Sequence, residues 1–307
     1  MAEAALLIGR GLQFASAMVL LGAPLFRLYA LGREVEGAGL VRTATLTAAA
    51  AGLGAALLVL MGQAASMTGE ASDALRPLVW FDVLSSTAFG RAWVVRFGLM
   101  LLMAGLALRR SWRWADQALL GVGGLATASL VWMGHGAADE GAAGLAHLLA
   151  DMAHLLAAAA WLGALAPLLL LVTWARRSRQ AGVAAVARRA LERFSGVGTA
   201  AVAVLVASGL INSWFLIGPT FPRSLVGTPY GLVLSAKLVL FTAMLALAAL
   251  HRWRSTPALA GRLDAGATPG EILRSLEISL ALETALAIGV LGLVAWLGVL
   301  APPGATA

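Results

Sequence analysis

The chain of 307 residues has no cysteine and few charged residues. Without cysteine it cannot form disulfides, thiolate metal sites, iron–sulfur clusters or a covalent c-type haem attachment. Asp, Glu, Lys and Arg make up 12% of the residues, against about 25% in a typical soluble domain. The sequence also lacks a G-x-x-x-x-G-K-[ST] phosphate-binding loop. These absences argue against a soluble protein and against ATP-driven pumping by this chain alone.

Apolar residues, by contrast, account for 60% of the chain, and the mean hydropathy is +0.87. A transmembrane helix needs about 20 mainly apolar residues. Apolar runs bounded by charges, glycine and proline predict eight such helices. Their expected ranges are 11–31, 43–67, 92–108, 115–134, 146–174, 195–218, 231–250 and 274–300. The predicted fold is all-α: a polytopic membrane protein whose residues 1–307 form one bundle of eight transmembrane helices.

The positions of the basic residues predict the orientation of this bundle. Of the 22 lysines and arginines, 16 fall in the first, third, fifth and seventh connections and three in the even connections. The positive-inside rule therefore places the odd connections in the cytoplasm and both termini on the outer side of the membrane. The net charge of +7 is then a topology signal, so we expect contacts with membrane lipid and none with nucleic acid.

Ionisable groups within the predicted spans are candidates for function, because charge inside lipid is costly. His147, Asp151 and His154 are spaced i, i+4, i+7, which places them on one face of a helix. The two imidazoles are about 10.5 Å apart along that helix, which favours two neighbouring metal sites over chelation of one ion. His135, in the preceding G-H-G-A-A-D-E-G loop, is expected to fold back over His147. The alternative is that each histidine only forms a hydrogen bond between helices.

Nearby methionines favour copper among the possible metals. Met133 precedes His135 by two residues, and Met67 ends the second predicted span on the same side of the membrane. Thioether and imidazole ligands without thiolate suit copper, Cu(I) especially, with Cu(II) also possible. Methionine is equally a common packing residue in apolar interiors.

A few other polar residues lie in or beside the predicted spans. Glu283 and Asn212 are deep enough to serve as a relay for an ion or a proton. Lys237 and Arg96 lie near the periplasmic ends of their spans, and we expect them to snorkel to the interface. His251 adjoins arginines at the opposite end and is expected to be a solvated interfacial histidine.

Several short motifs follow one another in a specific order, most densely between residues 130 and 303. They are M-G-H-G at 133–136, H-x3-D-x2-H at 147–154, A-A-W-L-G-A-L at 159–165, E-R-F-S-G at 192–196, S-G-L-I-N-S-W at 208–214, T-P-Y-G-L-V-L-S-A-K-L at 228–238, E-x-x-L at 283–286 and Pro-Pro at 302–303. In this order and spacing the chain resembles the CopD family of bacterial copper-resistance inner-membrane proteins.

The resemblance implies an eight-helix protein that takes copper from the periplasmic side and conducts it toward the cytoplasm. It also implies a partner, a separate periplasmic copper-binding protein of the CopC type. The family's histidines near the periplasmic face correspond to His135, His147 and His154. His251 departs from the pattern, since the family is expected to carry Asn before Arg at this position. The expected function is copper import, homeostasis or resistance, without enzymatic activity.

Two alternatives remain open from the sequence. In the first, two of the outer-face histidines are axial ligands of haem b, and the protein is a membrane electron-transfer protein or a copper or quinone reductase. In the second, the protein binds copper as a sensor or assembly scaffold and transports none. The sequence predicts neither the oligomeric state nor the oxidation state of the metal.

Overall fold

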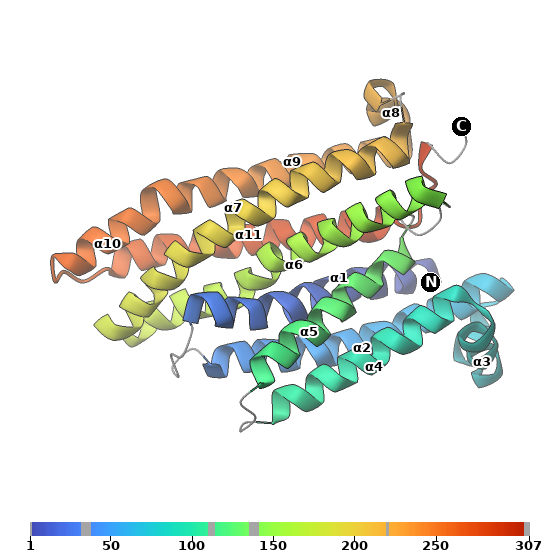
Figure 1. Cartoon of the computed structure of the whole chain (residues 1–307), viewed down its shortest axis with the longest axis horizontal. Coiled ribbons are helices and arrows are strands. Elements are labelled where there is room, and N and C mark those ends of the chain that lie inside the picture. Colours follow the sequence, from blue (N-terminus) through green and yellow to red (C-terminus); the bar gives the residue numbers. More distant parts are fainter. Residues whose placement is uncertain (1, 32–37, 110–113, 135–140, 219–220, 304–307) are drawn as a thin grey trace.

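The structure is a computed structural model that describes residues 2–31, 38–109, 114–134, 141–218 and 221–303. Every regular element in these ranges is helical, which confirms the predicted all-α fold. The long helices run side by side along the long axis of the molecule (Figure 1). They are α1 (Ala2–Phe26), α2 (Ala38–Thr68), α4 (Ala88–Leu108), α5 (Ala115–Ala128), α6 (Gly141–Ser178), α7 (Ala181–Ile217), α9 (Pro229–Leu250) and α11 (Gly270–Leu297).

Shorter elements connect or extend the long helices. They are the helices α3 (Pro77–Ser86), α8 (Phe221–Gly227) and α10 (Thr256–Asp264), the 3-10 helices η2 (Ala71–Leu75) and η3 (Ser129–Met133), and the π-helical turns η1 (Arg27–Leu31) and η5 (His251–Ser255). α9, η5 and α10 form one continuous stretch, Pro229–Asp264. Threonine caps open two of the long helices: Thr87 Oγ1 accepts a hydrogen bond from Gly90 N, and Thr228 Oγ1 accepts one from Gly231 N.

Seven helical stretches of the described chain are long and apolar enough to cross a membrane. The predicted span at 115–134 is different, because α5 has only 14 residues and then tightens into η3. The expected total of eight spans is therefore not confirmed by helix length. The described chain begins and ends at the same end of the bundle, opposite the end that carries α10 (Figure 1).

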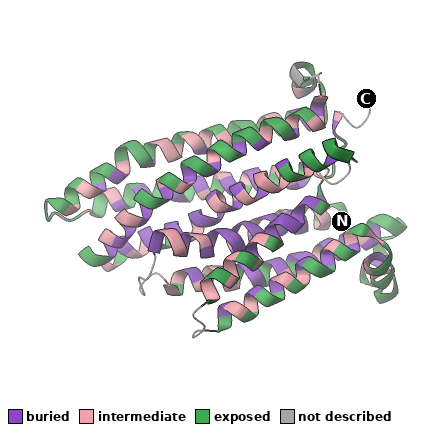
Figure 2. Cartoon of the chain, in the orientation of Figure 1, coloured by how far each residue is buried: buried purple, intermediate pink, exposed green. Residues whose placement is uncertain are grey.

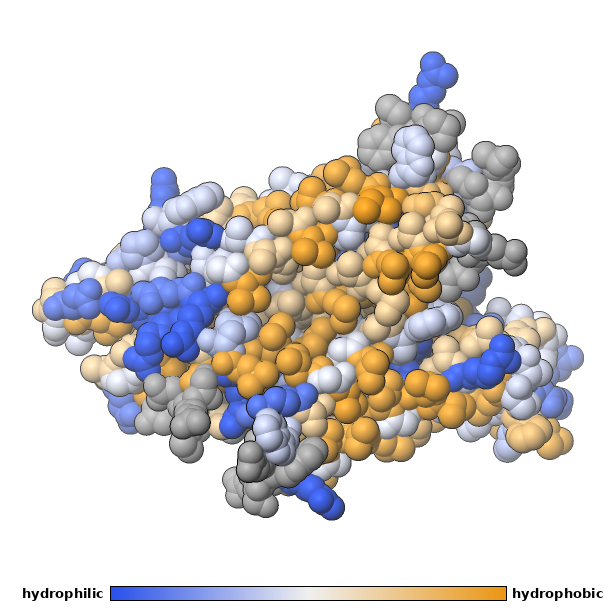
Figure 3. Space-filling view, in the orientation of Figure 1, coloured by the Kyte–Doolittle hydropathy of each residue, from blue (hydrophilic) through white to orange (hydrophobic). Residues whose placement is uncertain are grey.

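The outer surface of the bundle is apolar along most of its length. Val239, Leu210 and Ile288 are 67%, 66% and 64% exposed, as expected for side chains that face lipid. Figure 3 shows a broad hydrophobic band across the middle and hydrophilic residues gathered around α10 and the adjoining ends of α6 and α7. Buried residues concentrate on α1 and on the faces of other helices that turn toward it (Figure 2).

Helix α1 packs against α2, α5, α6 and α11, so it forms the centre of the bundle. Glycines bring the backbones of α1 and α6 into direct contact. A Cβ atom on Gly163 would lie 1.8 Å from the carbonyl oxygen of Met18, and one on Gly22 would lie 2.3 Å from that of Ala159. Small residues thus permit close helix packing, as is usual in membrane bundles.

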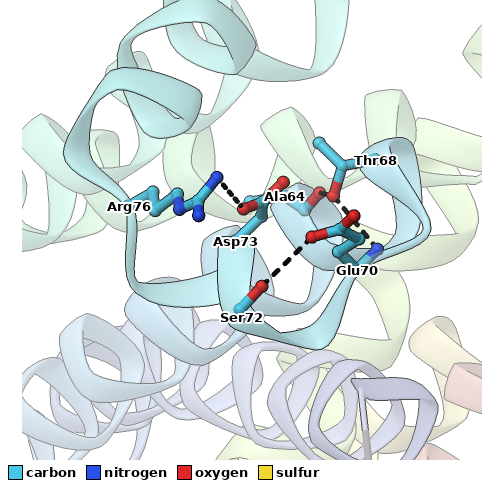
Figure 4. A network of polar contacts seen from close by, with 6 residues as sticks. All are labelled: Ala64, Thr68, Glu70, Ser72, Asp73 and Arg76. Carbon is cyan, nitrogen blue, oxygen red and sulfur yellow. Dashed lines mark hydrogen bonds and ion pairs between the residues drawn. The ribbon is translucent and has the colours of Figure 1, made fainter.

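The connection after α2 folds back on the end of that helix through a network of polar contacts (Figure 4). The backbone nitrogen of Glu70 donates to Thr68 Oγ1 at 3.3 Å, and Ser72 Oγ donates to Glu70 Oε2 at 3.3 Å. Arg76 Nη1 pairs with Asp73 Oδ1 at 2.9 Å. These contacts stabilise η2 against the end of α2.

Candidate functional site

A cavity of about 340 Å³ lies between α1, α6, α7, α9 and α11. Residues near the start of α1 and the end of α11 line it. We name it the outer cavity, after the side of the membrane on which the sequence predicts both termini to lie. Most of its wall is apolar, and a few polar side chains converge on it. These are Arg10, His147, Asp151, His154, Asn212, Ser213, Tyr230 and Lys237.

The predicted histidine–aspartate face of α6 lines this cavity. His147, Asp151 and His154 all contribute to the wall, so the structure brings the three predicted residues to one site. His147 is 2% exposed and stacks on Phe215 of α7, with ring centroids 4.7 Å apart and an interplanar angle of 5°. His154 lies seven residues, about two helical turns, farther along α6. The two imidazoles therefore occupy successive levels of the same cavity.

The hydrogen bonds around His154 determine which of its ring nitrogens is available. Ser208 Oγ donates its single proton to the carbonyl oxygen of Val204 at 2.6 Å. Ser208 Oγ also lies 3.0 Å from Nδ1 of His154, and with its own proton directed to Val204 it can accept the Nδ1 proton. The unprotonated nitrogen of the neutral ring is then Nε2, which carries the lone pair that a metal ion needs.

Asp151 is held in the cavity wall by a residue from the neighbouring helix. Nδ2 of Asn212 on α7 donates a hydrogen bond to Oδ1 of Asp151 at 3.2 Å. Asp151 also interacts electrostatically with His147 and Lys237. Its carboxylate is therefore the centre of the polar part of the cavity, and Asn212 supports it directly.

The structure does not place Lys237 and Arg96 as the sequence suggested. Both were expected to snorkel to the interface, but Lys237 lines the outer cavity and Arg96 is 1% exposed. Nε and Nη2 of Arg96 donate to the side chain and carbonyl oxygen of Ser129, at 3.0 and 2.7 Å. The tightening of α5 into η3 leaves Ser129 as an acceptor within reach, which turns Arg96 inward.

The two candidate methionines differ from the prediction in their surroundings. The sulfur of Met133 accepts a hydrogen bond from Arg96 Nη1 at 2.7 Å, and its carbonyl oxygen accepts one from Arg10 Nη2 at 2.7 Å. Met133 thus organises the two arginines beside the cavity. Met67 is 55% exposed and does not line the cavity. His135 lies outside the described residues.

The second half of the bundle holds the remaining candidates. Glu283 is fully buried on α11, away from the outer cavity. His251 was expected to be solvated, and this prediction is wrong, because the residue is only 6% exposed. The π-helical turn η5 turns its ring toward α11, where Nε2 lies 2.7 Å from Ser279 Oγ and Nδ1 lies 3.3 Å from Glu283 Oε2.

The sequence analysis missed Arg10, Ser213 and Tyr230 in the cavity wall, and it missed Ser208, which lies beside His154. Ser208 and Asn212 are four residues apart within S-G-L-I-N-S-W, so helical spacing alone puts them on one face. That spacing was the available signal for Ser208. No comparable signal exists for Arg10, which reaches the cavity from the first turns of α1.

The chemistry of the cavity suits a metal ion held by few protein ligands. Imidazole nitrogen and carboxylate oxygen are ligands that copper and zinc accept. Within the described ranges, no group of three or more His, Cys, Asp or Glu side chains is close enough to form a closed metal cluster. The positive charges of Arg10 and Lys237 further oppose tight retention of a cation.

The haem alternative finds no support in this geometry. Two axial ligands must approach one iron from opposite sides. His147 and His154 lie on the same helix, and His251 is engaged in the other half of the bundle.

Comparison with known proteins gives consistent matches. The family described as "Copper resistance protein D-like, N-terminal domain" matches residues 1–145, and the family "Copper resistance protein D" matches residues 188–297. No solved structure matches the chain significantly.

Three curated relatives match over long stretches. Copper resistance protein D of Pseudomonas syringae pv. tomato is 34% identical, with 93% of each chain covered. The copper transport protein CutJ of Bacillus subtilis (strain 168) is 32% identical over 67% of this chain and 38% of its own length. The inner membrane protein YebZ of Escherichia coli (strain K12) is 30% identical over 61% of each chain. From its helices, its family matches and these relatives, the chain is a multi-pass membrane protein of the copper resistance protein D (CopD) family.

Proposed function

We propose that this protein binds copper in the outer cavity and conducts it across the bacterial inner membrane, from the periplasm toward the cytoplasm. The observation that carries the proposal is the convergence of His147, Asp151 and His154 on one cavity in a chain related to copper resistance and copper transport proteins. In this proposal copper is the transported substrate, and the two imidazoles hold it at successive levels.

The orientation belongs to the same proposal. The end of the bundle with α10 carries the arginine-rich connections, which the positive-inside rule assigns to the cytoplasm. The outer cavity then faces the periplasm, and the chain crosses the membrane eight times if α5 with η3 counts as a span. A separate periplasmic copper-binding protein of the CopC type would deliver the ion to this face.

Copper content and copper flux together test the proposal. The full chain is purified in detergent and reconstituted in sealed vesicles, as wild type, His147→Asn and His154→Asn. We expect each substitution to lower bound copper and to slow copper entry at least 10-fold, because each removes one imidazole ligand. Met67→Leu is a matched control, since Met67 is exposed and away from the cavity, and it should behave as wild type.

The outcomes separate the alternatives. Wild-type levels of bound copper in both histidine variants would overturn the outer copper site. Bound copper that depends on the histidines, without flux into vesicles, would instead favour a sensor or scaffold. A Soret absorption band in the purified protein would favour haem.

A further inference from the structure

A second cavity, of about 230 Å³, lies between α6, α7, α9 and η5 on the α10 side of the bundle. We name it the inner cavity. His251 lines it, together with Trp161 and Arg252. Arg252 is engaged elsewhere, because its guanidinium donates to Thr199 Oγ1 and to the carbonyl oxygen of Ser195. The imidazole of His251 is therefore the group with metal-binding chemistry on this wall.

The carboxylate of Glu283 lies beside this imidazole, and no described residue donates a hydrogen bond to it. The residue is 0% exposed, and within the described part of the chain neither carboxylate oxygen accepts a hydrogen bond. Nδ1 of His251 lies 3.3 Å from Oε2, close enough for an ion pair but without the geometry of a hydrogen bond. A charged carboxylate buried without donors is unfavourable unless a cation completes its surroundings or a proton neutralises it.

The separation of these two atoms fits two ligands of one ion. Ligand distances of about 2.1 Å from nitrogen and oxygen to a metal, with the ligands 3.3 Å apart, give an angle of about 104° at the ion, close to tetrahedral. Ser279 Oγ, 2.7 Å from Nε2, can accept the proton of that nitrogen and leave the lone pair on Nδ1. Ser208 fixes His154 in the same way in the outer cavity, with the two ring nitrogens exchanged.

Trp161 lies between the two cavities. It is 1% exposed, and of the described residues it alone lines both. Its indole packs edge-on against Phe241, at 5.9 Å and 84°. Trp161 follows His154 by seven residues on α6, about 10.5 Å along the helix axis. It therefore closes the floor of the outer cavity on the side that leads to His251.

We propose that Nδ1 of His251 and the carboxylate of Glu283 form a second, weaker copper site on the far side of Trp161 from the outer cavity. The identity of the ion rests on the proposed function, whereas the pairing of ligands does not. With only two protein ligands, the site releases its ion more readily than a closed cluster of four ligands does. It is placed to receive an ion that has passed Trp161.

The test counts copper ions on the purified full-length protein in detergent. Wild type is titrated with Cu(II) and followed by electron paramagnetic resonance, beside Glu283→Gln and His251→Asn. We expect each variant to lose the weaker ion, with at least a 10-fold loss of affinity for it, and to keep the ions of the outer cavity. Glu277→Gln is the matched control, because Glu277 lies on the same helix but pairs with Arg176 and Thr173. It should bind as many ions as wild type.

A second preparation keeps the test decisive if a variant does not fold. The triple variant His135→Asn, His147→Asn, His154→Asn removes the three outer-face imidazoles and leaves His251 in place. A remaining Cu(II) signal with hyperfine splitting from one nitrogen supports the inner site, even if the outer site proves wrong. The inner site is overturned if this signal is absent, or if folded Glu283→Gln and His251→Asn bind copper with wild-type number and affinity.

Discussion

The side-chain amide of Asn212 donates a hydrogen bond to the carboxylate of Asp151 across 3.2 Å, which joins α7 to α6 inside the membrane. Asp151 is the carboxylate of the outer cavity, so its orientation depends on a residue of the adjacent helix.

Replacement of Asn212 by alanine should weaken copper binding without removing any direct ligand. Residues that orient metal ligands contribute about 10- to 100-fold to metal affinity, and we expect a loss in this range. Competition with a chromogenic copper chelator measures the dissociation constant. Ser213→Ala is the control, because Ser213 also lines the cavity but donates to the carbonyl oxygen of Gly209. Equal affinities in both variants would contradict this role of Asn212.

Ser208 should determine the tautomer of His154. In Ser208→Ala the ring of His154 loses the hydroxyl and keeps only its hydrogen bond with the backbone of Leu205, so its orientation and tautomer are less well fixed. We expect about a 10-fold loss of copper affinity. Ser208→Thr retains a hydroxyl and should restore most of the affinity. If the Ser208→Ala and Ser208→Thr variants bind copper with equal affinity, the hydroxyl has no part in orienting the imidazole of His154.

Arg96 should be sensitive even to a conservative change. Its guanidinium bonds to Ser129, Met133 and Gln13 at once, and a lysine ammonium cannot reach all three. Arg96→Lys should destabilise the protein by about 1–3 kcal/mol, because buried acceptors lose their donor. The thermal unfolding midpoint in detergent measures this effect. Arg91→Lys, at an exposed position of the same helix, should leave the midpoint unchanged.

Gly163 should tolerate no side chain. A Cβ atom there would overlap the backbone of Met18, so Gly163→Ala has to push α1 and α6 apart. We expect a loss of about 1–3 kcal/mol in unfolding free energy. Gly98→Ala is the control, since its Cβ would meet no atom within 4 Å, and there alanine should be neutral or slightly stabilising. Equal thermal unfolding midpoints for Gly163→Ala and Gly98→Ala would show that stability does not depend on the close contact between α1 and α6.

Much of the fold follows from simple patterns in the sequence. Apolar runs predict where helices cross the membrane, because the cost of exposing polar groups to lipid is large and local. The arginine distribution predicts the orientation of these helices. The region at 115–134 is the exception, since α5 tightens into η3 at Ser129, where the side chain of Arg96 from α4 makes its hydrogen bonds. That contact joins residues 33 positions apart in the sequence, and a hydropathy profile does not predict such contacts.

The candidate site is predictable where its residues share one helix. His147, Asp151 and His154 follow from helical spacing, and the structure places them on one cavity. The surroundings of His251 do not follow from spacing, because a π-helical turn shifts the register and Glu283 comes from another helix. Its neighbouring arginines suggested solvent, whereas packing against α11 decides its burial.

The backbone contact between α1 and α6 limits how this protein can move. Where Gly22 and Gly163 touch the opposite helix, no side chains remain to slide past one another, so the two helices form a rigid frame. Any opening of a passage around Trp161 must then come from displacement of α7, α9 or α11 against this frame. We expect α6, with its candidate ligands, to keep its place against α1 in such a displacement, while Asn212, Ser208 and Lys237 shift with α7 and α9.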